Sequence, residues 1–380
     1  MIIFLTIFLS LYGGLNLYGF LKAKRALSLD IGSSLPLLIF MIIMVFVPIL
    51  VRLSERQGFE TVARWLAFIG YFWMGLLFFF VSTALLIDIY HFLLYLGGLI
   101  LQRDFTGISL SPRISFFIPF FLCLAIGFYG YFEAIRIKAE HVTIRTSKIP
   151  EEASGLRIVQ ISDVHLGLIV REARLKRILE QVKAFDPDIL ISTGDLVDSQ
   201  MDDLLGLAAM LQEVRPKYGK FAVTGNHEFY AGLELSLDFT QKAGFTILRG
   251  EGLTVSGLIN IAGMDDQGDR QRNRPPGVSE RAVLYSLPRN NFTILLKHRP
   301  LLNKEATGLF DLQLSGHTHK GQVFPWNLIT RLSFPKDAGL FNLQNNAFLY
   351  VNRGSGTWGP PIRFLSPPEV TLIELVHEGS

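Results

Sequence analysis

The sequence has few of the features that stabilise small secreted domains or attract nucleic acid. Cys123 is the only cysteine among 380 residues, so an internal disulfide is excluded, which fits a reducing compartment without establishing one. The net charge is only +3, and we therefore expect no nucleic-acid partner. Charged residues make up 18% of the chain, whereas hydrophobic residues reach 49% and mean hydropathy is +0.35. This balance is too apolar for an ordinary soluble enzyme.

The apolar residues are concentrated in the first third of the chain. We expect a transmembrane helical region over residues 1–135, a linker over 136–153 and a globular domain over 154–380. Four apolar segments are candidates for membrane-spanning helices: residues 2–21, 35–51, 65–87 and 114–132. The first segment lacks the basic start and the cleavage site of a signal peptide, so we expect it to be retained.

Residues 88–101 are too short to form a fifth span. Burying Asp88 in hydrocarbon would be costly, so we expect an interfacial or re-entrant segment there. With four spans, the N-terminus and the globular domain share one side of the membrane. The loops on that side carry seven Lys or Arg residues against five on the other. The positive-inside rule then favours a multi-pass protein of a bacterial-type inner or plasma membrane, with its globular domain in the cytoplasm.

The part of the chain after Leu156 has the pattern of a layered α/β domain, because short apolar runs alternate with helical stripes. We expect helices at 171–185, 202–214 and 233–243. Mostly strand-like segments follow, which favours two sheets packed face to face. Side chains that can bind metal ions come directly after five of the apolar strands: Asp163 and His165, Asp195, Asn226 and His227, His298, and His317 and His319.

These polar clusters are expected to converge, since ligands of open α/β sheets bind beyond the carboxyl ends of strands. In an extended segment residues i and i+2 point to the same side, so His317 and His319 can reach one point. Carboxylate, imidazole and amide donors suit manganese, iron or zinc. Seven of these eight side chains as ligands would overfill one ion and serve two, which a bridging carboxylate and a bridging hydroxide would hold about 3.5–4 Å apart.

The order of five motifs resembles that of the calcineurin-like metallophosphoesterase superfamily: "DVH" 163–165, "GDLVD" 194–198, "GNHE" 225–228, "KHRP" 297–300 and "GHTH" 316–319. The resemblance covers roughly residues 154–377. The ending "YVNRGSGTWGPPIRFLSPPEVTLIEL" is similar to the branch whose members carry N-terminal membrane segments. The resemblance implies an α/β fold, a four-layer sandwich of two mixed sheets flanked by helices.

The resemblance also implies a role for each matched residue. Three residues would hold the first ion, three the second, and one would bridge them: Asp163, His165 and His319; Asn226, His298 and His317; and Asp195. His227 would bind the phosphate and protonate the leaving oxygen, which suits imidazole because its pKa lies near neutrality.

Several other residues near the motifs allow two interpretations. Asp198 either orients a ligand or acts as a cap or turn residue, while Glu228 is expected to support the turn beside it. Lys320 stands where many relatives carry glycine, and it either meets a phosphate or lipid headgroup or is solvated at the rim. Residues 323–341 either form an apolar loop facing the bilayer or pack into the core. Three arginines either bind an anionic headgroup or lie on a solvated loop: Arg270, Arg272 and Arg274.

Together these features predict a membrane-anchored two-metal phosphoesterase. A metal-bound hydroxide would attack a phosphodiester or pyrophosphate, and the membrane segments make a lipid-linked or nucleotide-sugar-lipid substrate attractive. One alternative is a transporter or channel-like protein with a regulatory phosphoesterase domain, and another is a non-catalytic metal-bound scaffold. The sequence leaves open the metal, the leaving alcohol and the oligomeric state.

Overall fold

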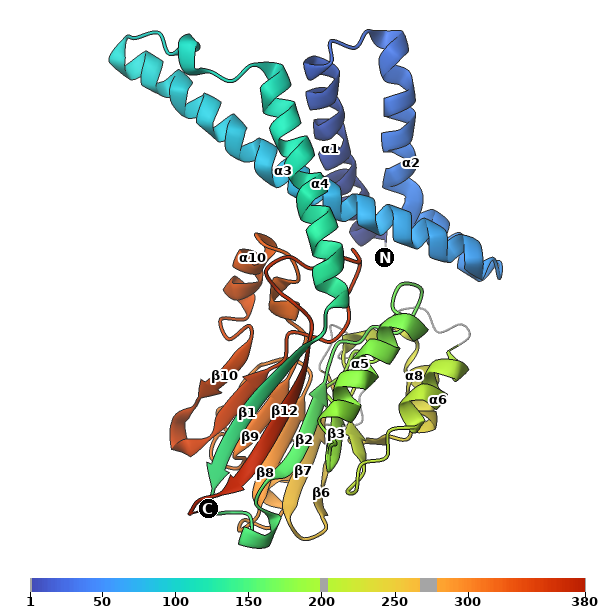
Figure 1. The fold of residues 1–380 in the computed structure, drawn as a ribbon, viewed down its shortest axis with the longest axis vertical. Coiled ribbons are helices and arrows are strands. Elements are labelled where there is room, and N and C mark those ends of the chain that lie inside the picture. Colours follow the sequence, from blue (N-terminus) through green and yellow to red (C-terminus); the bar gives the residue numbers. More distant parts are fainter. Residues whose placement is uncertain (1, 199–203, 267–278, 380) are drawn as a thin grey trace. The chain divides into compact units, whose positions relative to one another are not determined.

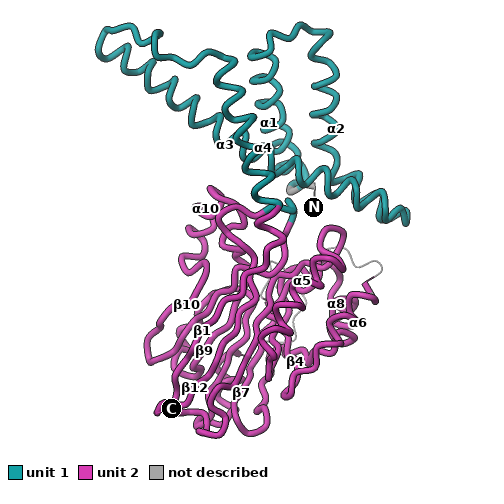
Figure 2. The backbone as a smooth tube through the Cα atoms, in the orientation of Figure 1, with its two compact units in different colours: residues 1–131, 359–362 teal, residues 132–358, 363–380 magenta. Residues whose placement is uncertain are grey.

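The chain folds into two compact units, which Figure 2 shows in different colours. The structure is a computed structural model, and it describes residues 2–198, 204–266 and 279–379. Unit 1 comprises residues 1–131 and 359–362, and unit 2 comprises residues 132–358 and 363–380. Figure 1 labels the helices and strands.

Long helices make up unit 1: α1 (Ile2–Ala26), α2 (Ile31–Arg56), α3 (Glu60–Leu101) and α4 (Pro112–Ile135), the last of which continues into unit 2. Among the described residues, three segments are long and apolar enough to cross a membrane: Ile31–Arg56, Glu60–Leu101 and Thr106–Ile135. They contain three of the four expected spans. The expected span at 2–21 lies in α1, which is not among these candidates, so a fourth span stays a prediction, as does the orientation.

Helix α3 corrects the expectation of a separate segment at residues 88–101. It runs without a break for 42 residues, about 63 Å at 1.5 Å per residue, which is roughly twice the thickness of a hydrocarbon core. Asp88 is tolerated within the helix because its carboxylate is paired. It forms an ion pair with Lys22 and accepts a hydrogen bond of 2.7 Å from the Tyr18 hydroxyl.

Unit 2 is built on two mixed six-stranded sheets. In spatial order the first sheet contains β1 (Lys138–Thr146), β12 (Glu369–His377), β2 (Leu156–Ile161), β3 (Ile189–Ser192), β4 (Lys220–Ala222) and β5 (Thr246–Ile247). The second sheet contains β10 (Gly339–Asn342), β11 (Phe348–Val351), β9 (Leu312–Ser315), β8 (Phe292–Lys297), β7 (Ile259–Met264) and β6 (Glu251–Val255). Strands β2, β3, β4 and β5 are parallel, as are β7, β8 and β9, so the carboxyl ends within each group share one edge.

Side chains along one strand alternate between two hydrophobic cores, because successive side chains point to opposite faces of a sheet. Ile158 of β2 packs against second-sheet residues such as Ile294, whereas Val159 packs toward the helices on the other face. Those helices are α5 (Glu172–Ala184), α6 (Leu205–Gln212) and α8 (Leu233–Lys242), which cover one side of the first sheet in Figure 1. Two short helices, α7 (Asn226–Ala231) and α9 (Glu280–Tyr285), complete this part, and α9 packs on the second sheet. The predicted sandwich of two mixed sheets flanked by helices is confirmed.

Two segments of unit 2 differ from the sequence-based expectation. The expected linker 136–153 is wrong for residues 138–146, which form β1 and pair in parallel with all nine residues of β12. The apolar segment 323–341 is not only a loop, because it contains helix α10 (Trp326–Ser333). Strand β1 depends on a partner that is distant in the sequence, and α10 is only eight residues long, so local composition does not reveal them.

Candidate metal centre

The predicted ligands all follow carboxyl ends of strands in unit 2, as the sequence indicates. Asp163 and His165 come after β2, and Asp195 comes after β3. Asn226 begins α7 directly after β4. The remaining three come from the second sheet, after β8 and β9: His298, His317 and His319. Because the two sheets face each other, both sets of strand ends can supply one site, and six of the seven ligands fall into overlapping groups of potential metal-binding atoms.

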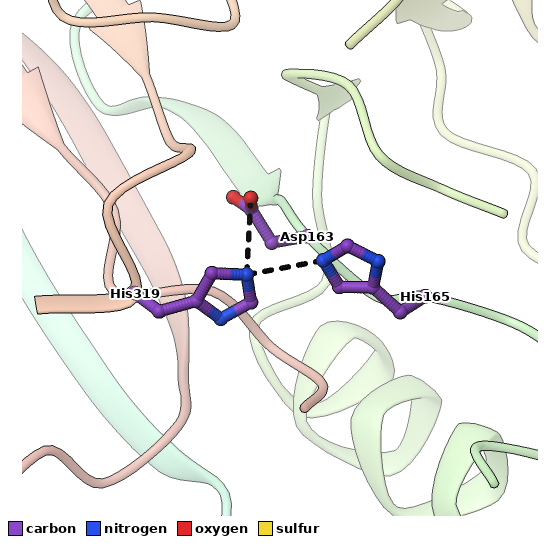
Figure 3. A group of neighbouring side chains, drawn as sticks. All are labelled: Asp163, His165 and His319. Atoms are coloured by element: carbon purple, nitrogen blue, oxygen red, sulfur yellow. Dashed lines mark hydrogen bonds and ion pairs between the residues drawn. The ribbon is translucent and has the colours of Figure 1, made fainter. Parts of the chain in front are cut away.

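The first group comprises Asp163, His165 and His319, whose side chains point toward one another in Figure 3. The Nε2 atoms of His165 and His319 lie 3.0 Å apart, and His319 Nε2 lies 3.4 Å from Asp163 Oδ1. All three residues are buried. Two imidazole nitrogens facing each other beside a carboxylate form a donor set that suits a divalent cation.

The second group comprises Asp195, His298 and His317. His298 Nε2 lies 3.2 Å from Asp195 Oδ2 and 3.1 Å from His317 Nδ1. Asp195 Oδ2 also lies 3.8 Å from His165 Nε2, so this carboxylate stands between the two groups. That position is the one a bridging ligand would need.

Two further contacts support the fit to metal ions. The Oδ1 atom of Asn226 is buried and has no hydrogen-bond partner among the described residues. Leaving such an atom unsatisfied costs about 1–3 kcal/mol, which a bound cation would offset. The Thr193 carbonyl oxygen accepts a hydrogen bond of 2.9 Å from His298 Nδ1. The other ring nitrogen, Nε2, therefore faces the site.

The electrostatics of the site also suit metal binding. Burial lowers the pKa of His165 to about 4 and that of His317 to about 3, so both imidazoles are neutral and offer lone pairs near pH 7. Burial opposes ionisation of Asp195, but the neighbouring His298 and His227 outweigh it and hold the carboxyl pKa well below its usual range. The site therefore combines neutral imidazoles at His165 and His317 with an ionised carboxylate at Asp195. Burial opposes protonation of His298, but the Asp195 carboxylate outweighs it and raises the pKa of His298 to about 10.

The backbone is strained at five of the predicted ligands, which adopt left-handed φ angles of 47° to 73°: Asp163, His165, Asp195, His317 and His319. Residues other than glycine rarely adopt this conformation, and it persists only where the surroundings enforce it. Such strain clusters at functional sites. The close packing around Gly316 is one enforcing contact, since a Cβ there would lie 2.2 Å from Asp163 Oδ2.

Two carboxylates outside the ligand set organise the site, the buried Glu228 and the half-buried Asp198. Glu228 accepts backbone N–H groups from two turns, with distances of 3.0 Å to Asp195 N and 2.6 Å to Gly225 N. The expectation that it supports the turn is confirmed. Asp198 Oδ1 lies 2.9 Å from His227 Nδ1, so of its two interpretations the structure supports orientation of a site residue. This contact fixes the His227 ring.

Arg363 is a functional residue that the sequence-based interpretation does not single out. Its side chain is fully buried, and its Nη2 atom lies 3.0 Å from His319 Nδ1. The guanidinium also donates to the carbonyl oxygens of Arg353 (2.7 Å), Gly356 (2.6 Å) and Ser366 (3.1 Å). Arg363 thus connects the C-terminal segment to the turn that carries His319. The sequence marks Arg363 only by its place in "GPPIRFLSPPE". A single arginine in that stretch does not indicate a contact with a metal ligand.

Other polar residues near the motifs form structural contacts, lie on the turn beside His319, or fall outside the described residues. Asp265 forms a two-point contact with Arg249 through distances of 2.9 and 2.7 Å, which is a structural role. Lys320 is half-buried on the turn beside His319, and its contact with a headgroup stays a prediction. The three arginines of the 269–276 loop lie outside the described residues: Arg270, Arg272 and Arg274.

Comparison with known proteins agrees with this geometry. Residues 156–321 match the calcineurin-like phosphoesterase family. The chain is 41% identical over 261 residues to an uncharacterized metallophosphoesterase of Aquifex aeolicus, covering 68% of this chain and 100% of the relative. It is 31% identical to a transmembrane protein with metallophosphoesterase domain from Danio rerio, covering 83% of this chain and 75% of the relative. An uncharacterized metallophosphoesterase of Helicobacter pylori is 33% identical over 74% of this chain and 79% of its own length.

These similarities define the class of the protein. It belongs to the calcineurin-like metallophosphoesterase family, and its His and Asp residues for metal binding are intact. The chain is a metal-dependent phosphoesterase with buried metal-site clusters in unit 2 and three candidate membrane-spanning helices.

Proposed function

We propose that the protein is a membrane-anchored hydrolase of phosphodiester or pyrophosphate bonds that uses two divalent ions, drawn from manganese, iron or zinc. The observation that carries this proposal is the position of Asp195 between the two donor groups, 3.2 Å from His298 and 3.8 Å from His165. When bound, the ions would activate water as the nucleophile and neutralise charge on the phosphate. Asp163, His165 and His319 would hold one ion, and Asn226, His298 and His317 the other, with Asp195 shared.

His227 is the proposed general acid. Its Nδ1 is held by Asp198, which leaves Nε2 as the atom that can carry a proton to the leaving oxygen. Burial opposes protonation, but the carboxylates of Asp195 and Asp198 outweigh it and raise the pKa of His227 to about 9. The proton is therefore present at neutral pH. His227 also lies within reach of His165 and Asp195 as a potential metal ligand, and the two roles make different predictions.

The His227→Gln variant separates an acid from a ligand. For an alkyl phosphodiester, whose leaving alkoxide needs a proton, we expect kcat to fall about 10²–10⁴-fold. For a p-nitrophenyl diester the loss should be far smaller, because p-nitrophenolate departs without protonation. Steady-state kinetics with both substrates and metal analysis of the same preparations provide the measurement.

The control for this variant is His141→Gln, which alters an exposed histidine paired with Glu374 at 3.2 Å. It should leave both rates and metal content unchanged. Equal losses on the two substrates, or loss of bound metal from His227→Gln, would contradict the assignment as acid.

The second part of the proposal is that the substrate is linked to a lipid. Tyr230 and Trp358 are each 55% exposed and place their rings edge-on to His227, with centroids 5.3 and 6.0 Å away. Phe334 lies edge-on to His317 at 5.1 Å. This aromatic surface beside the donor groups suits a phosphate ester with an apolar substituent. Such a substrate would be a lipid-linked phosphodiester or pyrophosphate, including a nucleotide-sugar-lipid.

Turnover of a lipid-linked diphosphate and of its soluble head-group analogue, compared in detergent, tests this preference. Burial of only two methylene groups contributes about 0.8 kcal/mol each, which corresponds to roughly tenfold in kcat/KM. We therefore expect a preference of about tenfold or more for the lipid-linked compound. A preference for the soluble analogue would reject the lipid-linked class while leaving the two-metal reaction intact.

A further inference from the structure

Helix α10 exposes an apolar face. All eight of its residues are described, and none is buried. Its large apolar side chains are 47–83% exposed and lie along one side of the helix at i, i+3 and i+4 spacings: Trp326, Leu328, Ile329 and Leu332. Isolated helices this short are marginal in water, because most helical stability comes from packing of an apolar face. The face therefore needs a partner.

The position of α10 in unit 2 indicates which partner. Glu133, in the last turn of α4, accepts hydrogen bonds from the backbone N–H groups of Leu365 (3.3 Å) and Ser366 (2.9 Å). Phe364 in turn accepts from Phe324 N at 3.1 Å, and α10 begins two residues later. Glu133 lies two residues before the end of the candidate span Thr106–Ile135, so a bilayer crossed by this span would have its boundary close to the segment of unit 2 that contacts α10.

The surroundings of α10 extend this apolar surface and add basic side chains. Phe324 and Leu365 are 41% and 56% exposed. Lys336 lies over the Phe341 ring at 5.4 Å, and Arg331, on the helix itself, is about half exposed while paired with Asp337. Apolar side chains beside basic ones are typical of helices that lie in the interface of anionic membranes.

We propose that α10 is an interfacial membrane helix whose occupant is the lipid bilayer itself, with Trp326, Ile329 and Leu332 inserted at the boundary of headgroups and acyl chains. The inference concerns location and does not depend on the reaction. An α10 bound in this way would hold the metal centre at a fixed distance from the membrane surface, because α10 contacts the turn that carries His319. A Cβ at Gly321 would lie 2.3 Å from Asn327 Cα, so the turn and the helix backbone are in direct contact.

Site-specific labelling of the full chain in lipid nanodiscs tests the proposal. In a Cys123→Ser background, Leu332→Cys carries an environment-sensitive fluorophore, and Leu235→Cys, on the exposed side of α8, is the matched control at 62% exposure. Doxyl-labelled lipids should quench the label at 332 several-fold more than that at 235. Aqueous iodide should show the opposite order.

Equal quenching by doxyl lipid at the two positions would overturn the proposal. Protection of position 332 from both quenchers would also overturn it, because a second copy, another protein or the chain's own helices would then cover α10. The same measurement at Ile329→Cys decides the question if Leu332→Cys does not fold. Circular dichroism and thermal unfolding verify folding of each variant, and failure of the proposed reaction would leave the quenching result unaffected.

Discussion

Replacement of Asp195 by asparagine is expected to reduce phosphoesterase activity by on the order of 10⁴-fold. Asp195 belongs to two of the potential metal-binding groups, and its Oδ2 atom lies between His298 and His165. Asparagine keeps the size of the side chain but removes its negative charge and replaces one acceptor oxygen with a donor. Neither ion would then have the shared carboxylate, so both donor groups lose affinity together.

The loss of activity in Asp195→Asn must be distinguished from a general loss of folding. The backbone N–H of His227 donates to Asp195 Oδ1 at 2.8 Å, and the amide oxygen of asparagine can still accept it. We therefore expect the melting temperature without added metal to stay close to that of the unmodified protein. Asp238→Asn, which alters an exposed aspartate on α8 paired with Lys242, should retain full activity. Retention of activity within tenfold by Asp195→Asn would exclude a bridging role.

Replacement of Arg363 by methionine should have the second large effect. The guanidinium donates to carbonyl oxygens of Arg353, Gly356 and Ser366 and contacts His319, all in a buried environment. Methionine fills similar space but leaves these acceptors without a donor. By analogy with the breaking of buried charge networks, we expect a loss of about 3–5 kcal/mol in the free energy of unfolding. Metal affinity should fall about 10–100-fold, because the turn that carries His319 loses its support.

Thermal unfolding in detergent and metal titration measure the two consequences for Arg363→Met. Arg281→Met, an exposed arginine on α9, provides the matched control and should behave like the unmodified protein. If Arg363→Met unfolds at the unmodified temperature and binds metal with unchanged affinity, the buried network has no structural role. A loss of stability without a change in metal affinity would limit Arg363 to folding.

The convergence of the candidate ligands could be predicted from the sequence because its signals are local. Each metal-competent residue follows an apolar strand, and the carboxyl ends of parallel strands necessarily share one edge of a sheet. The left-handed backbone at residues such as Asp163 and His317 carries no such signal, since it is imposed by tertiary contacts. Arg363 was missed for a similar reason: it acts on His319, 44 positions away in the chain.

The elements missed or misassigned share dependence on distant partners. The sequence of β1 resembles a polar segment, and the strand is stabilised by pairing with β12, more than 200 residues later. Helix α10 is eight residues long and buries none of them, so its apolar stretch resembles a loop or core segment in the sequence. Asp88 suggested a break in α3 because its partner Lys22 lies on another helix. For β1 and for Asp88 of α3 the stabilising contact is non-local, and residue patterns report only the local preference.

The central claim is that seven side chains of unit 2 hold a pair of neighbouring cations. Metal analysis of the purified full chain after manganese loading, combined with electron paramagnetic resonance, tests it most directly. We predict two manganese ions per chain with the spectrum of an exchange-coupled pair. A single ion per chain, or two ions with uncoupled spectra, would contradict the shared carboxylate and the two-metal account.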